Sequence, residues 1–598
     1  MKHPHTEIIS SALEATAWEM SASLIRTAYS PNVKERADCS TGLCDIEGRT
    51  LALATHGPAH LGSMLRMVPA ICERFPLSKM RPGDAFFAND PYIVGVTHLN
   101  DCTLAAPIFV DDKIAGFAAA VAHHSDVGGR VPGSESGDCT SIFQEGIRVP
   151  PVLMFAEGKL RADVLEMFLL NSRTPHLSEG DIYAQLAATA SGIQRVRELH
   201  VRYGSDAVRR SIVAMLDATE RRLRTSIRDN LRDGVYRAVD WLDEDGISDT
   251  PVKLAVTITV KDDTVAFDFT ECAAQLGTGK NIPYTHTMAT VYYCLKAMSD
   301  PNVPINEGMF RPVSVIAPEG SVVNPRSPAG VSSRNLTSMI LADVIVDALG
   351  QAAPERALAA SGPYQGIILA GTTADRQRYF VDYENFAGGQ GARCDGDGMD
   401  VVQVHMSNTA NLPIEVMEIE FPVRVERYEV STDSGGAGKY RGGCGVYRDL
   451  RILGDDVVLS VRSARQKFAA QGRDGGHAGQ LGAYVLNPGT ASEQTLRSTF
   501  SERPMQQGDL LRIVTPGGGG LGSPAAREPR AVAQDVAHGK VSAAAARANY
   551  KVACSDDGEA VDDMETFRLR GIAPNVALSN HPHQIVDNVV ASAPHLRR

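Results

Sequence analysis

The chain lacks the local signatures of several common enzyme classes. It has no GxxxxGK[ST] phosphate loop, no complete Rossmann or kinase signature, no GxSxG elbow and no HExxH pair. None of these routes to nucleotide binding or catalysis is therefore indicated. The ten cysteines include no CxxC pair, which favours reduced, buried thiols over a disulfide framework.

Long apolar runs and an excess of positive charge are also missing. No run approaches 18 apolar residues, and the opening MKHPHTEIIS has no apolar signal core, so we expect a cytoplasmic protein without a membrane span. The net charge of -12 argues against nucleic acid or an anionic membrane surface as the main partner. A hydrophobic content of 43% is ordinary for a globular protein.

Hydrophobic periodicity predicts an α+β fold in several domains, because 598 residues are too many for one core. Helical spacing predicts a helix over 6–29 and a helical region from about 179 to 241, broken at Gly204. Alternating residues predict a hairpin over 252–270 that turns at Asp262 and Asp263. Two further helices are expected over 285–299 and 335–352.

The chain is rich in predicted strands and dense in glycine from about 400 to 515, which is typical of a sandwich or barrel-like domain. A short helix follows, and the tail after about Pro574 has no clear periodicity. We expect four segments: an N-terminal α/β metal-site domain with long helices at its end (1–245), a central α/β domain (246–400), a β-rich domain (401–525) and a C-terminal helix and tail (526–598).

Two short segments concentrate histidine and carboxylate: NDPYIVGVTHLND (89–101) and AHHSDVGG (122–129). His98 and Asp101 lie three residues apart, so both side chains can reach one point from a single turn. His123 ends a run of small residues, GFAAAVA, that predicts a buried strand. Imidazole with carboxylate suits a divalent ion such as Zn²⁺, Mn²⁺ or Fe²⁺. A set of hydrogen-bonded loop histidines explains the same pattern, and the local sequence leaves both interpretations open.

Two other features bear on chemistry. Asp38 stands between the first predicted helix and a strand-like STGLCD, where its carboxylate could join the histidine set, although the local pattern gives this only weak support. The glycine run Gly517–Gly520 lacks the lysine of a phosphate loop, and it predicts a tight turn or close backbone packing.

An ordered series of motifs resembles the hydantoinase B/oxoprolinase family. The motifs are KERADCS, NDPY with THLND, AHHSDVGG, QEGIRVPP, NSRTP with GDIYAQLAA, SGGAGKYRGGCG and PGGGGLG. The resemblance extends from about residue 5 to residue 570. Members of this family include N-methylhydantoinase B subunits, the C-terminal half of ATP-dependent 5-oxoprolinase, and the large subunits of acetone and acetophenone carboxylases.

The resemblance implies a division of labour between two subunits. A hydantoinase A-type partner would bind ATP and phosphorylate an amide, enolate or bicarbonate oxygen of a small-molecule substrate. The present chain would hold a divalent metal (Zn or Mn, possibly Fe) and complete hydrolysis or carboxylation. The expected assembly is a hetero-oligomer such as α2β2, with no nucleic acid and no membrane.

The resemblance also assigns residues. It implies that Asp38, His98, Asp101 and His123 are the metal ligands. His124 and Asp126 then become candidates to orient those ligands or to relay protons. Glu19, in the WEM stretch of the first helix, is implied as a general base.

Three functions remain open at this point. The preferred one is an ATP-dependent cyclic amide hydrolase of the hydantoinase or 5-oxoprolinase type, in which phosphorylation removes amide resonance before water attacks. The alternative is a subunit of an ATP-dependent ketone carboxylase. The large subunits of acetone carboxylases are longer than this chain, which favours hydrolysis. A non-catalytic scaffold for the ATP-hydrolysing partner is the third possibility.

Overall fold

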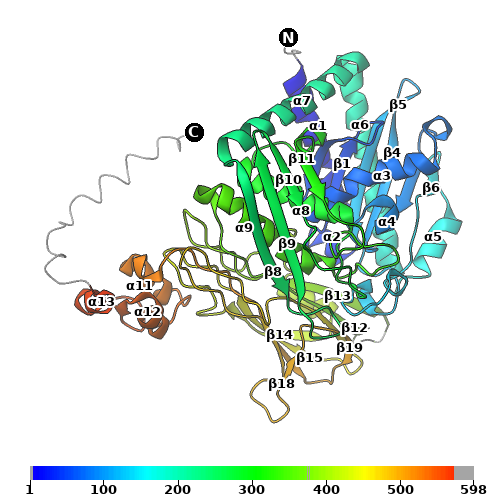
Figure 1. Ribbon diagram of the computed structural model, residues 1–598. Helices are drawn as coiled ribbons and strands as arrows, with labels where there is room; N and C mark the ends of the chain where they lie inside the picture. Colours follow the sequence, from blue (N-terminus) through cyan, green and yellow to red (C-terminus); the bar gives the residue numbers. More distant parts are fainter. Residues whose placement is uncertain (1–4, 374, 376, 572–598) are drawn as a thin grey trace.

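The computed structural model describes residues 5–571 apart from 374 and 376. It confirms an α+β architecture with several sheets (Figure 1). The predicted features of the tail after Pro574 lie outside the described residues. In the part of the chain that is described, no helix is long and apolar enough to cross a bilayer.

The N-terminal region is built on a seven-stranded antiparallel sheet in the order β2-β1-β5-β4-β3-β6-β7. Its central hairpin pairs β4 with β5, and Asp101 lies directly opposite His123. The strands are β1 (Cys39–Cys44), β2 (Thr50–Thr55), β3 (Ala85–Ala88), β4 (Asp101–Val110), β5 (Lys113–His123), β6 (Val152–Ala156) and β7 (Lys159–Leu160).

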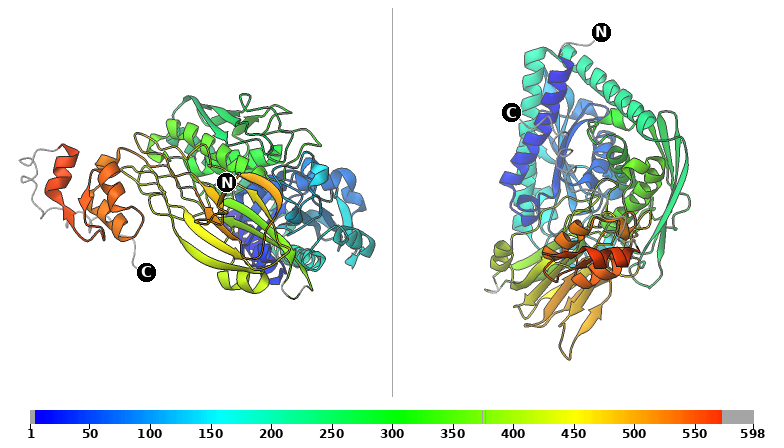
Figure 2. Two further views of the ribbon diagram at one scale, coloured as in Figure 1. Left: turned by 90° about the horizontal axis from the view of Figure 1, so that it is seen from below. Right: turned by 90° about the vertical axis from the view of Figure 1, so that its left-hand side faces the viewer.

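Helices cover both faces of this sheet, and β5 is buried between them (Figure 2). Ala118, Ala120 and Ala122 pack in one core with α1 (Thr6–Thr27), α6 (Pro175–Tyr203) and α7 (Ser205–Asn230). Phe117, Ala119 and Val121 pack in another with α3 (Leu61–Arg74), α8 (Tyr284–Ser299) and α9 (Arg334–Ala352). Because strand side chains alternate between faces, the residues that end β5 also point to opposite sides.

The structure confirms the helices predicted over 285–299 and 335–352 and the hairpin, but the helical region expected to reach residue 241 ends at Asn230, and Gly234–Leu242 form a strand instead. The break at Gly204 separates α6 from α7, and the hairpin of β9 (Val252–Lys261) and β10 (Thr264–Asp268) turns with Asp262 at φ 54°. These strands form a four-stranded sheet in the order β11-β10-β9-β8, with β8 (Gly234–Leu242) and β11 (Val313–Ile316) at its edges. β8 precedes the boundary expected near residue 245, so this sheet crosses it.

Two further sheets share one hydrophobic core in the second half of the chain. Their orders are β13-β12-β16-β19 and β14-β15-β20-β17-β18. The first sheet joins strands from both sides of residue 400. The elements are β12 (Gln365–Thr372), β13 (Tyr379–Phe386), α10 (Ile414–Glu420), β14 (Val423–Val430), β15 (Val446–Ile452), β16 (Val458–Arg462), β17 (Ala483–Leu486), β18 (Gln494–Leu496), β19 (Thr499–Pro504) and β20 (Leu510–Val514).

The glycine run Gly517–Gly520 follows β20 inside a block of other glycine-rich segments. A Cβ on Gly517 would lie 1.8 Å from the Ser434 carbonyl oxygen, and one on Gly518 would lie 2.1 Å from that of Gln390. All four N–H groups of the run donate to backbone carbonyls. The run therefore serves close backbone packing, as predicted, and its amides are not free to cradle a phosphate.

A small C-terminal unit stands beside the main body, at the lower left of Figure 1. Its helices are α11 (Pro529–Ala537), α12 (Ala543–Tyr550) and α13 (Asp563–Arg570), and its two-stranded sheet pairs β21 (Ala553–Cys554) with β22 (Val561–Asp562). A separate hydrophobic cluster holds this unit together, and Ala437 of the glycine-rich block belongs to that cluster.

Candidate metal centre

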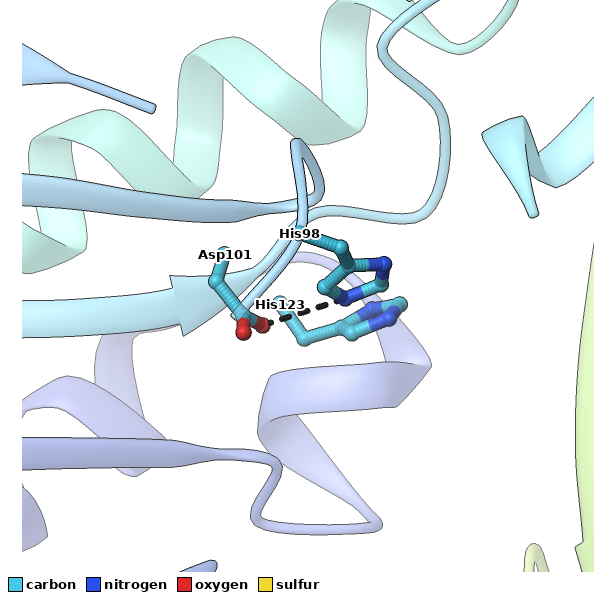
Figure 3. Close-up of side chains that lie close together, drawn as sticks. All are labelled: His98, Asp101 and His123. Atoms are coloured by element: carbon cyan, nitrogen blue, oxygen red, sulfur yellow. Dashed lines mark ion pairs between the residues drawn. The ribbon is translucent and has the colours of Figure 1, made fainter. Parts of the chain in front are cut away.

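The ends of two paired strands bring His98, Asp101 and His123 together (Figure 3). Asp101 begins β4 and His123 ends β5, and the two are direct cross-strand partners. His98 comes from the turn before β4, where its carbonyl accepts from the Asp101 N–H. His98 Nε2 lies 3.3 Å from Asp101 Oδ1, and one ligand atom from each residue lies within 4.8 Å of the others.

These side chains are buried without the hydrogen bonds that buried polar groups normally make. His98 and Asp101 are fully buried, and His123 is 2% exposed. Neither ring nitrogen of His98, nor Asp101 Oδ1, nor His123 Nε2 has a hydrogen-bond partner among the described residues. Leaving such a group unsatisfied costs about 1–3 kcal/mol. Several unsatisfied atoms converging on one point therefore indicate a ligand.

The electrostatics put the three residues in the protonation states that a cation needs. Burial lowers the pKa of His98, and burial together with His98 holds the pKa of His123 well below its usual range. Burial acts to raise the pKa of Asp101, but His98 and His60 outweigh it and hold that pKa well below its usual value. The arrangement is two neutral imidazoles and one carboxylate.

The other oxygen of Asp101 is already committed to the protein. Thr97 Oγ1 donates to Asp101 Oδ2, and Arg334 Nε donates to the same threonine at 2.8 Å. This chain of contacts fixes the carboxylate plane so that Oδ1 turns toward His98. A supporting layer of this kind is typical of metal-ligating carboxylates.

Asp38 borders the cluster through His60, a residue that the sequence patterns did not indicate. Asp38 Oδ1 lies 3.8 Å from His60 Nε2, and the same nitrogen lies 3.5 Å from Asp101 Oδ1. Ser40 Oγ lies 3.0 Å from His60 Nδ1 and fixes the ring. Burial raises the pKa of Asp38 to about 6, with Asp101 adding to the rise and His60 opposing it. His60 thus joins Asp38 to the centre, although no local motif marks it.

A second polar layer around the cluster is built from residues that are far apart in the sequence, and no local motif marks them. The Tyr383 ring packs 4.8 Å from that of His123, and its hydroxyl donates to Glu135. Glu135 also pairs with Arg334 at 3.4 Å and with Arg462 at 3.3 Å. These contacts clamp the β-rich half of the chain onto the end of the N-terminal sheet.

His286, in the first turn of α8, is a further buried histidine near this layer. Both of its ring nitrogens lack hydrogen-bond partners among the described residues, and burial with Arg334 holds its pKa well below its usual range. The charges of Asp101, His60 and His98 also act on it. No motif around His286 marks it as part of the site, and it stands out in the sequence only as a histidine.

The structure does not bring His124 and Asp126 to the cluster. His124 points to the opposite face of β5, where its Nε2 lies 3.3 Å from Gln185 Oε1 on α6. Asp126 folds back on its own loop and accepts from the backbone N–H groups of Gly128, Gly133 and Arg173, each at 2.9 Å. Alternation along the strand explains the first result, because adjacent side chains face opposite ways.

Glu19 also lies apart from the cluster. It is on the solvent side of α1, and its Oε2 accepts from Arg195 of α6 at 2.7 Å. Both side chains of this pair are about half exposed. Its position does not support the general-base role expected from the resemblance.

His98, Asp101 and His123 fit a divalent ion by two tests. The donor set of two imidazoles and a carboxylate is one that Zn²⁺ and similar ions accept, and such ions at bond lengths near 2.0–2.1 Å hold tetrahedral ligands about 3.3 Å apart. The His98–Asp101 separation of 3.3 Å matches that spacing. The unsatisfied atoms point inward, and the Asp38 carboxylate is linked to the set through His60.

The chain is similar to known proteins over nearly its whole length. An uncharacterized protein of Methanocaldococcus jannaschii is 39% identical over 573 residues, 95% of this chain and 99% of its own. The B-type chain of a putative D-/L-hydantoinase from a Pseudomonas strain is 32% identical over 583 residues, 95% and 97% of the two chains.

Solved structures share the fold. The crystal structure of an ATP-dependent caprolactamase from Pseudomonas jessenii matches with a TM-score of 0.86 at 28% identity, covering 95% of this chain and 99% of that one. An acetone carboxylase matches with the same TM-score at 20% identity, covering 98% of this chain and 84% of that one, which is a likeness of fold. The family Hydantoinase B/oxoprolinase matches residues 3–524. The chain belongs to the hydantoinase B/oxoprolinase family.

Proposed function

We propose that this chain is the metal-bearing subunit of an ATP-dependent cyclic amide hydrolase, opening a ring that a partner subunit has activated. The observation that carries the proposal is the convergence of unsatisfied, buried atoms of His98, Asp101 and His123. Relatives named as a hydantoinase and as an ATP-dependent caprolactamase support the amide-hydrolase branch.

His98, Asp101 and His123 would hold the ion, with Asp38 as the fourth group. Zn²⁺ and Mn²⁺ suit this donor set, and Fe²⁺ is compatible with it. The chemistry that such an ion supplies is Lewis-acid activation of water and of a carbonyl or phosphoryl oxygen.

The rest of the chain would orient the ligand side chains and exclude bulk water from the site. Thr97 and Arg334 hold the Asp101 carboxylate in one orientation, and Tyr383 packs against the His123 ring. Asp38 lies 3.8 Å from His60 Nε2, and that nitrogen lies 3.5 Å from Asp101 Oδ1, so His60 would link the fourth group to the other ligands. The full burial of His98 and Asp101 keeps bulk water away from the reacting centre.

Activation would come from a hydantoinase A-type partner that binds ATP, in a hetero-oligomer such as α2β2. Relatives whose names mark them as the B or beta component of an enzyme support a two-subunit assembly. The glycine run offers no phosphate site here, since its N–H groups are used within the fold. A ketone carboxylase subunit remains the alternative, but the likeness to acetone carboxylase is one of fold and brings no residue-level support for it.

The test is reconstitution with an A-type partner and ATP, presenting hydantoins and lactams in one set of reactions and ketones with labelled bicarbonate in another. We expect ATP-dependent ring opening that His98→Ala abolishes. Label incorporated into a keto acid without ring opening would move the chain to the carboxylase branch. Turnover by this chain alone without ATP would overturn the division of labour.

A further inference from the structure

Asp38 is the residue at which solvent reaches the metal centre. The side chains of His98 and Asp101 are fully buried, and those of His123 and His60 are almost fully buried. The Asp38 side chain, in contrast, is 18% exposed. A small molecule that comes to the centre without unfolding the surrounding sheet therefore has to come past Asp38.

A cavity of about 420 Å³ lies next to this exposed edge of the centre. His56 and Pro58 form part of its wall. Gly57 lies between them, and a Cβ on Gly57 would be 3.9 Å from Asp38 Oδ1. The same short stretch of chain therefore borders the cavity and contacts the metal-centre residues.

A second part of the cavity wall leads to the same place. Ser407 and Asn408 line the cavity, and the Ala410 N–H donates to the Arg36 carbonyl at 3.1 Å, two residues before Asp38. The lining also includes exposed residues, namely Asn408, Ala297 on α8 and Met399. The cavity thus opens to solvent and extends toward the chain around Asp38.

Gly57 leaves space at the inner end of this cavity, and its backbone does not require a glycine. Its φ of -106° and ψ of 114° lie in the extended region, which every residue adopts and which a residue before proline prefers. A Cβ at this position would lie 3.5 Å from the His60 ring, an ordinary contact distance. What the glycine provides is therefore the absence of a side chain between the cavity wall and the centre.

The cavity wall suits passage better than tight binding. The Tyr293 hydroxyl and His405 Nδ1 both belong to the lining, and they lie 3.4 Å apart and pair with each other. Arg356 donates to the Ser299 carbonyl at 2.7 Å. Apolar side chains such as Met298 face the same space. Polar groups that already have partners gain little from a ligand, so they would not retain a molecule on its way to the centre.

We propose that this cavity is the route by which the substrate reaches the metal centre, and that Gly57 limits the size of the molecule that passes. The inference rests on the cyclic amide hydrolase function proposed above, and it adds the residue that selects among rings of different size. A side chain at position 57 would occupy the space beside Asp38 and His60 without straining the backbone. It would therefore hinder large molecules more than small ones.

The test measures how fast bipyridine, a small neutral chelator, removes metal from the purified full-length chain while the rate still rises with chelator concentration. Gly57→Val adds a side chain at the inner end of the cavity, and Ala297→Trp narrows its exposed rim from α8. We expect both variants to keep their metal and to lose it to bipyridine severalfold more slowly than the wild type. Gly277→Val is the matched control, because a Cβ there would meet nothing within 4 Å.

Ring size gives a second measurement, in the reconstituted enzyme. Gly57→Val should lower kcat/KM about tenfold more for caprolactam than for the smaller pyrrolidinone. Metal removal at the wild-type rate from both metal-bearing variants would overturn the inference and leave the proposed hydrolase function in place. Slower removal, in a chain whose reconstituted wild type opens no lactam, would support the route and contradict the proposed function. If Gly57→Val does not fold or loses its metal, the Ala297→Trp result decides.

Discussion

The histidine cluster (His98, Asp101 and His123) and the glycine run (Gly517–Gly520) are both conspicuous in the sequence. They differ in whether their hydrogen-bonding groups have partners. At Gly517–Gly520 every N–H donates to a backbone carbonyl, and neighbouring chain segments leave no room for a Cβ. At His98, Asp101 and His123, buried polar atoms converge with no hydrogen-bond partner in the described structure. The first region is complete as built, whereas the second has polar atoms that a cation would satisfy.

Conspicuous sequence motifs can be told apart by whether their hydrogen-bonding groups already have partners. A glycine run followed by a turn invites a phosphate-binding interpretation until its donors are accounted for. A pair of histidine-rich segments invites a purely structural interpretation until its hydrogen-bond acceptors are also accounted for. Counting the hydrogen-bond partners of each group separates the two cases, and mutations in each region test the contrast.

The largest expected effect is on folding, from Gly518→Ala. The new Cβ would lie 2.1 Å from a backbone carbonyl oxygen, which no side-chain movement can relieve. We expect a loss on the order of 4 kcal/mol or more in the free energy of unfolding, measured by urea denaturation. Gly277→Ala is the control, because its Cβ would meet nothing within 4 Å. A stable, folded Gly518→Ala protein would show that the block is not close-packed.

The next largest effect is expected at Glu145, where the atom without a partner is a carboxylate oxygen. Glu145 is buried, its Oε1 accepts from the Val331 and Ser332 N–H groups, and its Oε2 has no partner among the described residues. Burial raises its pKa from 4.5 to about 7, so a proton can satisfy this oxygen. A raised pKa means that its stabilising contribution is full below pH 4.5 and is lost as the pH rises to 7.

Glu145→Gln should therefore remove a pH dependence of about 3 kcal/mol between those two pH values. Urea denaturation of both proteins across that window measures the difference directly. Parallel pH profiles for wild type and variant would contradict the account.

A smaller effect is expected at His60, which links Asp38 to Asp101. His60→Leu should weaken metal affinity about 10- to 100-fold, as loss of a supporting contact to a ligand does. His60→Gln keeps an amide N–H near the position of Nε2 and should recover most of the affinity. Chelator competition measures both, with His56→Gln as the neighbouring control, since His56 contacts Ser21 instead. Equal affinity for all three variants would remove His60 from the centre.

The smallest effect is expected at Glu19. Its contact with Arg195 is solvent-exposed and remote from the cluster, and such pairs contribute little. Glu19→Ala should leave kcat/KM of the reconstituted enzyme within about twofold and change stability only slightly. A large fall in kcat with an unchanged KM would restore the general-base role that the resemblance implied.

Much of the fold follows from the sequence because its signals are local. The long helices, the break at Gly204 and the hairpin at Asp262 each depend on spacing within a few turns, and the structure confirms them. The sheet orders were not predictable, because pairing β12 with β16 depends on contacts almost a hundred residues apart.

The candidate site likewise contains residues that local sequence patterns mark and residues that only tertiary packing brings in. His98, Asp101 and His123 lie on two short segments whose strands pair directly, so the local pattern pointed to them. His60, His286 and Tyr383 reach the same place only through tertiary packing, and nothing near them in sequence marks that role. The position of His124 on the opposite face of the strand could have been predicted, because adjacent side chains in a strand point to opposite sides and His124 follows His123.

Elemental analysis of the purified chain shows whether the unsatisfied atoms of the histidine cluster hold a metal ion. We expect about one divalent ion per chain in the wild type and almost none in His98→Ala. Because His98 makes no side-chain hydrogen bond within the described residues, the variant should remain folded, which circular dichroism can check. A wild-type chain without metal after metal-replete purification, or a folded His98→Ala chain that keeps its ion, would contradict the account.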